Sequence, residues 1–190
     1  MRLYLVRHAH TQINPDTNAR EWGLSEKGIV QAQKLLSHEF WEQVDHIFLS
    51  SEEKTFLTVQ PVLETYDIPT TIDARFDELR RSGWTDDYLA QVTEVFAHPD
   101  KSISGWDSAT SALTRFRQGI DAIVNSHSHE TVAVVGHGLT MSLYRAYLLG
   151  YEQVRVEEWQ QLGFGTIAEV EISSSNMNNL KQAILVRDFE

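Results

Sequence analysis

Short apolar runs alternate with longer amphipathic stretches along most of the chain. Four of the short runs are rich in apolar or β-branched residues, which predicts strands. These runs are residues 3–6, 46–50, 70–74 and 131–135. The longer stretches repeat their apolar residues at helical spacing, which predicts helices. They cover residues 25–40, 56–66, 85–97, 108–123 and 139–149.

Particular residues mark where the predicted helices begin, end or break. Ser25 and Ser108 stand where N-caps are expected, and Gly150 follows a last apolar residue, where it is expected to end a helix. Pro61 falls inside the second helix and is expected to kink or interrupt it, because proline has no backbone N–H.

Late in the chain the hydrophobic period changes to two. Residues 166–172 and 182–186 predict two strands joined by a polar turn at 173–180. Strands that alternate with helices indicate a three-layer α/β/α sandwich, with a mostly parallel central sheet and an antiparallel addition near the C-terminus. The chain has 190 residues and no internal repeat or linker, so we expect a single domain over residues 1–190.

Composition narrows the possible chemistry. The chain has no cysteine, which excludes zinc–thiolate sites and every phosphatase or protease that attacks through a thiolate. Its net charge of −11 argues against a nucleic-acid surface. No run approaches the roughly 18 apolar residues that span a membrane, and no signal sequence is recognisable. We therefore expect a cytoplasmic protein without nucleic-acid or membrane partners, and the oligomeric state stays open.

Histidines directly follow two of the predicted strands. His8 comes after the first strand and is preceded by Arg7, while His137 follows a later strand and stands between two glycines. A lone histidine after a strand is more often a surface residue than a catalyst. Ligands, however, collect at the carboxyl ends of parallel strands, so two such histidines would face one crevice if their strands are neighbours. The pattern indicates a candidate site at that edge of the sheet.

Several short motifs are spread in order over nearly the whole chain. The first is Arg7-His8-Ala9, at the end of the first predicted strand. The others are Asn14, Leu24 to Ala32, Ser50-Ser51, Phe76 to Leu79, Trp106 to Ser108 and Val134 to Gly138. Together they resemble the motifs of the histidine phosphatase superfamily, the phosphoglycerate-mutase-like proteins, whose first motif is Arg-His-Gly.

The resemblance implies a metal-independent hydrolase, without a cofactor, that acts on a small or medium-sized organic phosphate ester. It implies that His8 attacks phosphorus and forms a phosphohistidine, while Glu78 is the general acid and then the general base. It assigns the phosphoryl oxygens to Arg7, His137 and Asn14. This suits the chemistry, because a phosphate monoester is close to a dianion at neutral pH and needs positive groups around it.

The sequence departs from the family pattern at the second phosphate-binding arginine. Our register places Lys54 there, and lysine keeps the charge but lacks the planar fork that grips two oxygens. Glu52 and Glu53 stand beside it and are expected to compete for its ammonium group. Three outcomes stay open. Lys54 replaces the arginine, another arginine such as Arg20 or Arg81 enters the pocket, or phosphate binding is weakened.

The stretch 80–107 has the position of a lid-like insertion near the site. It contains Trp84, Tyr88, Phe96 and Trp106. We expect at least half of these aromatic residues to pack in the core and the rest to give the cavity a partly apolar cover.

Three other functions fit parts of the sequence. A phosphoglycerate mutase would return the phosphoryl group to an acidic sugar phosphate, which favours more cationic side chains than the insertion supplies. A non-catalytic phosphate-ester binding protein would keep the pocket and lose turnover, with Lys54 as the lesion. The third is a metal-dependent hydrolase of the amidohydrolase type. The pairs His8-x-His10 and His127-x-His129 have the spacing of its metal ligands, but those barrels need about 250 residues. We expect no metal.

Overall fold

A mixed sheet forms the centre of the protein in the computed structural model, which describes residues 1–81, 83–174 and 181–190. Its strands within these ranges are β1 (Arg2–Arg7), β2 (His46–Leu49), β3 (Thr70–Ile72), β4 (Thr131–Gly136), β5 (Ile167–Ser174) and β6 (Lys181–Arg187). They lie in the order β3-β2-β4-β1-β5-β6. The neighbours from β3 to β1 are parallel, whereas β5 and β6 are antiparallel additions. The predicted sheet is confirmed, while part of the predicted turn, residues 175–180, lies outside the described residues.

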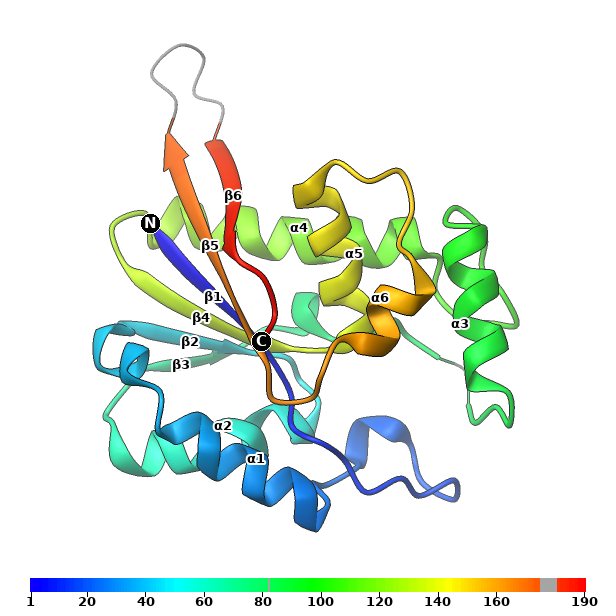
Figure 1. Ribbon diagram of the computed structural model, residues 1–190, viewed down its shortest axis with the longest axis horizontal. Helices are drawn as coiled ribbons and strands as arrows, with labels where there is room; N and C mark the ends of the chain where they lie inside the picture. Colours follow the sequence, from blue (N-terminus) through cyan, green and yellow to red (C-terminus); the bar gives the residue numbers. More distant parts are fainter. Residues whose placement is uncertain (82, 175–180) are drawn as a thin grey trace.

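Helices cover both faces of the sheet. They are α1 (Glu26–Leu36), α2 (Glu53–Thr65), α3 (Tyr88–Ala97), α4 (Ala109–Ser126), α5 (Gly138–Leu149) and α6 (Val156–Gln161). Figure 1 shows α1 and α2 on one side of the sheet and α4 and α5 on the other. The three-layer arrangement is therefore confirmed, although the sequence pattern did not reveal α6. Among the described residues, no helix is both long and apolar enough to cross a membrane, and the cytoplasmic location stays a prediction.

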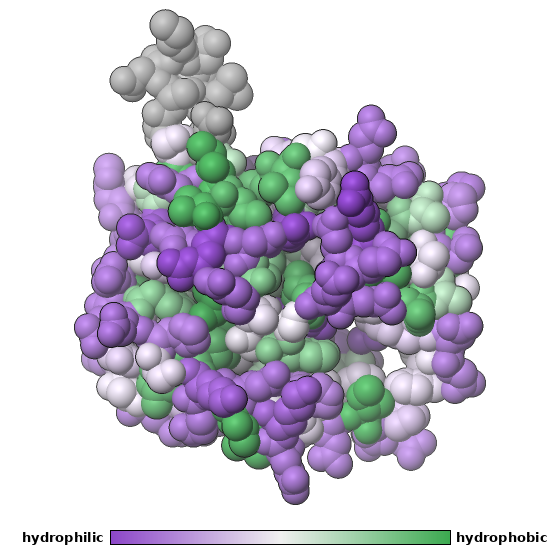
Figure 2. Space-filling view, in the orientation of Figure 1, coloured by the Kyte–Doolittle hydropathy of each residue, from purple (hydrophilic) through white to green (hydrophobic). Residues whose placement is uncertain are grey.

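The strand β1 is buried because its side chains alternate between two cores. Leu3 and Leu5 pack in a cluster with Phe116 of α4, and Tyr4 packs on the opposite face in a cluster with Leu35 of α1. Full burial of such a side chain contributes roughly 1.5–3 kcal/mol. Both faces of β1 thus hold the strand at the centre of the sheet. The outer surface is mostly polar and charged in the face that Figure 2 shows.

The predicted helix boundaries hold where a side chain or glycine marks them. The Ser25 hydroxyl accepts a hydrogen bond from the Gly28 N–H at 3.1 Å, and the Ser108 hydroxyl accepts one from the Ser111 N–H at 3.1 Å. Gly150 ends α5 with a φ of +69°, a left-handed conformation that favours glycine. These three positions confirm the signals that the sequence carried.

The first helix is shorter than predicted, because side chains satisfy its last carbonyl groups. The Ser37 hydroxyl donates to the Lys34 carbonyl at 2.7 Å, and the Trp41 indole N–H donates to the Leu35 carbonyl at 2.7 Å. These contacts let α1 stop at Leu36, and a short 3-10 helix follows it.

Of the two predicted effects of Pro61, the interruption of the second helix does not occur, and the kink stays a prediction. The helix α2 continues from Glu53 to Thr65 with the proline inside it. Val59 and Val62 lie on either side of Pro61 and are both fully buried. Their packing against the sheet offsets the one backbone hydrogen bond that proline cannot make.

The stretch 80–107, of which residue 82 lies outside the described residues, divides its aromatic residues between two roles. Phe96 and Trp106 are buried in a core cluster that α4 and α5 share. Tyr88 packs against that cluster, and Trp84 is 50% exposed. Two of the four aromatic residues therefore belong to the core. The helix within this stretch begins at Tyr88, three residues later than predicted. That the stretch acts as a lid, and that residues 1–190 form one domain, stay predictions.

Candidate active site

The pairing of β1 with β4 brings two histidines to one edge of the sheet. Arg7 is the register partner of Gly136, so both strands end at the same level. The ring centroids of His8 and His137 lie 5.1 Å apart, and both side chains are buried. The backbone N–H of His8 donates to the Gly136 carbonyl at 2.9 Å, which fixes the end of β1 against β4. The crevice that the sequence suggested is therefore formed.

His8 presents a free ring nitrogen. Its Nδ1 lies 2.8 Å from the Ala9 carbonyl oxygen, which can only accept a hydrogen bond. Nδ1 therefore carries the proton, and Nε2 keeps its lone pair. Burial lowers the pKa of His8 well below the ordinary value of 6.5, and the nearby His137, Lys54 and Arg7 lower it further. The result at neutral pH is an uncharged imidazole that can act as a nucleophile.

His137 reports the positive potential of the site. Its Nε2 lies 2.6 Å from the Ser50 hydroxyl oxygen. Burial lowers the pKa of His137 well below 6.5, and the positive charges of Lys54, Arg81 and Arg7 add to this effect. The charges that disfavour a proton on His137 would favour an anion beside it.

Glu78 is buried and caps the helix that follows β4. Its Oε1 accepts hydrogen bonds from the N–H groups of Leu79 at 2.9 Å and Thr140 at 3.1 Å, and its Oε2 accepts one from Leu139 at 3.0 Å. The N-cap residue of α5, His137, makes no side-chain cap of its own. The carboxylate of Glu78 takes that place and lies beside the histidines rather than in solvent.

A single arginine of α4 holds the loop that carries Glu78. Arg115 donates from its guanidinium to a row of backbone carbonyls at distances of 2.9–3.1 Å. These carbonyls belong to Ala74, Arg75, Asp77 and Glu78. No local motif marks Arg115, so this role could not be predicted from sequence patterns.

Arg7 lies against the loop before β5 and keeps one donor unused. Its Nη1 donates to the Leu162 carbonyl, and its guanidinium carbon lies 4.0 Å from the centroid of the Phe164 ring. A Cβ atom at Gly138 would come within 2.8 Å of that guanidinium, which explains the glycine after His137. The Nε of Arg7 is buried without a hydrogen-bond partner in the described part of the chain.

Lys54 lies in the same cavity and is paired with an acid. Its Nζ lies 2.7 Å from Oε2 of Glu52 and also donates to the Ala19 carbonyl, and both side chains of the pair are buried. The Oε1 of Glu52 accepts the Glu78 N–H at 2.9 Å and lies 3.7 Å from Nε2 of His137. Glu52 therefore touches three parts of the site. The sequence indicated its competition for Lys54 but not its two other contacts.

The two arginines considered as substitutes take different positions. Arg81 lines the cavity, with its guanidinium 5.1 Å from the ring centroid of Tyr88. Arg20 also lines the cavity, but one of its nitrogens lies 2.6 Å from the Ser51 hydroxyl and 2.9 Å from the Asp77 carboxylate. Lys54 lowers the pKa of both histidines and Arg81 lowers that of His137, whereas Arg20 is held by Ser51 and Asp77.

Asn14 is the one predicted site residue that the structure does not bring to the cavity. It is exposed, and its side-chain oxygen accepts the Asp16 N–H at 3.1 Å within its own turn. The same loop contributes Thr11, Thr17 and Asn18 to the cavity lining instead.

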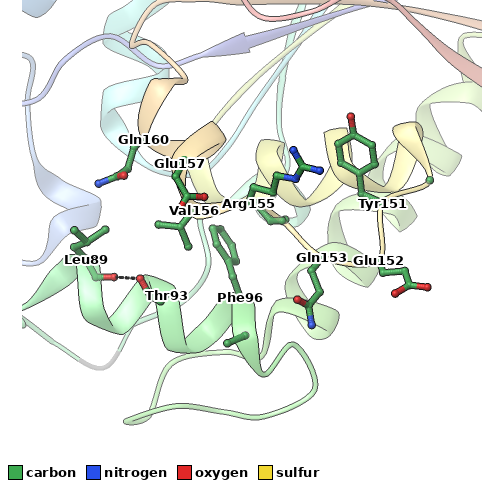
Figure 3. A pocket seen from close by; sticks show the side chains of 13 residues that line it. Leu89, Thr93, Phe96, Tyr151, Glu152, Gln153, Arg155, Val156, Glu157 and Gln160 are labelled. Atoms are coloured by element: carbon green, nitrogen blue, oxygen red, sulfur yellow. Dashed lines mark hydrogen bonds between the residues drawn. The ribbon is translucent and has the colours of Figure 1, made fainter.

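The cavity above these residues has a volume of about 970 Å³. Its lining includes His8, Arg7, Lys54, Glu78 and His137, and it is far larger than a phosphate group. A second hollow of about 840 Å³ lies between α3 and α6 and contains none of these side chains (Figure 3). In the described ranges, no group of three or more histidine, aspartate or glutamate side chains is arranged to hold a metal ion.

Comparison with known proteins decides the family. The profile of the histidine phosphatase superfamily (branch 1) matches residues 3–183. The chain belongs to this superfamily. It is 27% identical over 164 residues to phosphoserine phosphatase 1 of Hydrogenobacter thermophilus, a match that covers 80% of this chain and 78% of the relative. It is also 27% identical over 164 residues to the adenosylcobalamin/alpha-ribazole phosphatase of Salmonella typhimurium, covering 78% and 80% of the two chains.

Solved structures confirm the fold of this superfamily member. Bacillus stearothermophilus YhfR superposes with a TM-score of 0.80 at 20% identity and covers 100% of this chain and 96% of its own. A mycobacterial glucosyl-3-phosphoglycerate phosphatase superposes with a TM-score of 0.77 at 19% identity and covers 97% of each chain. The family and its phosphatase relatives confirm the predicted class of enzyme, a hydrolase of phosphate monoesters.

The lowered pKa of His137 makes stability depend on pH. Below about pH 6.5 the unfolded chain protonates His8 and His137 but the folded protein does not, so each lowers the free energy of unfolding by up to about 1.4 kcal/mol for every unit by which the pH falls. We expect His137→Asn to remove its share of this slope, with that of His8 remaining, in urea unfolding curves recorded between pH 7 and pH 5. The exposed His38→Asn is the control and should keep the wild-type slope. A slope unchanged in His137→Asn would contradict the buried neutral state.

Proposed function

We propose that this phosphatase hydrolyses a small or medium-sized organic phosphate ester through a phosphohistidine on His8. The observation that carries the proposal is the presence of an uncharged His8, with Nε2 free, and the guanidinium of Arg7 in one cavity. The first is a nucleophile that needs no base, and the second is a cation that suits the phosphoryl oxygens.

In the first step the lone pair of His8 Nε2 forms a bond to phosphorus as the ester P–O bond breaks. The electron pair of that bond goes to the leaving oxygen, which takes a proton from the carboxyl group of Glu78. Arg7 and Lys54 stabilise the charge on the phosphoryl oxygens. The imidazole carries positive charge after this step, and the Ala9 carbonyl that accepts its Nδ1–H stabilises it.

In the second step a water molecule attacks phosphorus and gives one proton to the Glu78 carboxylate. The P–N bond breaks, its electron pair returns to His8 Nε2, and inorganic phosphate leaves. The N–H groups of Leu139 and Thr140 at the start of α5 stabilise the carboxylate that this step requires. After this step Glu78 is protonated and His8 is uncharged, as both were before the first step.

The relatives support the substrate class. One is named a phosphoserine phosphatase and another an adenosylcobalamin/alpha-ribazole phosphatase, and the phosphates of serine and of alpha-ribazole are small esters. A cavity of about 970 Å³ accommodates a phosphoryl group together with an organic part of that size.

His8→Ala tests the nucleophile. We expect turnover of p-nitrophenyl phosphate to fall on the order of 10³-fold or more, and EDTA to leave the wild-type rate unchanged. Wild-type enzyme mixed with ³²P-labelled ester and quenched in alkali should carry label on His8. Absence of label during turnover would contradict the mechanism. Transfer of label to a second ester without release of phosphate would instead indicate a mutase.

Glu78→Gln tests the general acid. An alkyl phosphate needs a proton on its leaving oxygen, whereas p-nitrophenolate leaves without one. We expect kcat/KM for the alkyl ester to fall roughly 10²–10⁴-fold and kcat/KM for p-nitrophenyl phosphate to fall much less. This ratio reports the first step alone, because P–O cleavage commits the substrate. An equal loss for both esters would remove Glu78 from the acid role.

Lys54 and Glu52 are tested together through inhibition by inorganic phosphate. Lys54→Ala should raise the inhibition constant about 10-fold or more, because a charge-assisted hydrogen bond is lost. Glu52→Gln should lower it, because the amide keeps an acceptor for the Glu78 N–H but no longer competes for the ammonium group. The exposed Lys34→Ala is the matched control. Unchanged phosphate inhibition in Lys54→Ala would place Lys54 outside the binding site.

A further inference from the structure

Two tryptophans form an aromatic wall next to the phosphate-binding cations. Trp22 comes from the loop after β1 and Trp84 from the stretch before α3, and both line the cavity. Their ring centroids lie 6.2 Å apart with an angle of 56° between the ring planes. The ammonium nitrogen of Lys54 lies 6.0 Å from the centroid of the Trp22 ring. The two tryptophans are therefore adjacent to Lys54, one of the cations of the site.

Both tryptophans are held in place through their indole N–H groups. The Trp22 indole N–H donates to the Asn14 carbonyl at 3.0 Å, and the Trp84 indole N–H donates to the Asp86 carboxylate at 2.8 Å. These bonds fix the rings by their edges. Trp84 is nevertheless 50% exposed. A fixed apolar ring that faces both a catalytic cavity and solvent gains most from a ligand that covers it.

We propose that Trp22 and Trp84 form a subsite for the leaving group and that this subsite takes an aromatic or heteroaromatic ring. The inference rests on the proposed hydrolysis. In that reaction the ester oxygen joins the phosphoryl group, which lies among the cations beside His8, to the aromatic ring of the leaving group. Two rings tilted by 56° allow a third ring to stack on one face and to meet the other through its edge. A short aliphatic ester leaves both faces uncovered.

The test compares 1-naphthyl phosphate with glycerol 2-phosphate. The two esters differ in intrinsic reactivity, so the measured quantity is the change in the ratio of their kcat/KM values from one variant to the next. Trp84→Ala should lower this ratio about 5- to 10-fold, in keeping with the loss of one aromatic contact. Trp84→Phe should keep the ratio within about 2-fold of wild type. Tyr147→Ala, a matched control at an aromatic residue of similar exposure on α5, should leave it unchanged.

An unchanged ratio in Trp84→Ala, or a drop of equal size in Tyr147→Ala, would overturn the subsite. A binding measurement separates this failure from a failure of the proposed function. In His8→Ala, which does not turn over, calorimetry compares the dissociation constants of 1-naphthyl phosphate and inorganic phosphate with and without Trp84→Ala. Selective weakening of 1-naphthyl phosphate supports the subsite even if the wild-type enzyme hydrolyses neither ester. Equal weakening of both ligands, or none, overturns it.

Discussion

The parallel pairing of β1 with β4 is the constraint on which the site depends. The register sets Arg7 opposite Gly136, so the histidine after each strand emerges at the same level. Burial on both faces of the sheet keeps that register, because a slip by one residue would exchange the two faces of β1. The glycine after His137 then lets the Arg7 guanidinium lie against the start of α5. The packing of the core thus keeps the register of β1 and β4, and this register places the residues of the cationic site.

The site concentrates positive potential inside an acidic protein with a net charge of −11. Burial keeps both histidines uncharged, so the permanent cations are arginine and lysine. Glu52 neutralises part of that charge, since it pairs with Lys54. An anion entering the cavity must compete with this carboxylate for the ammonium group. In the proposed hydrolysis, this competition would ease the release of inorganic phosphate after turnover.

Local patterns predicted the elements of the fold, and long-range contacts explain what they missed. Periodicity and capping residues such as Ser25 sufficed for most strands and helices. Pro61 does not interrupt α2, because the burial of its neighbours outweighs a local preference. Asn14 was assigned to the site by resemblance, but its side chain accepts a bond within its own turn. The anchoring of the Glu78 loop by Arg115 joins segments some 37–41 residues apart, and no local window contains such a contact.

The lysine at the second cationic position also connects the two halves of the cavity. An arginine fork would orient itself against phosphate, whereas an ammonium group is a point charge that other groups must hold in place. Here Glu52 and the Ala19 carbonyl hold it. The Ala19 contact fixes the loop that carries Trp22, whose ring then lies beside the same ammonium group. In the proposed function, the lysine that meets phosphate as a point charge thus also holds the loop that carries Trp22, so it would link phosphate binding to the recognition of the leaving group.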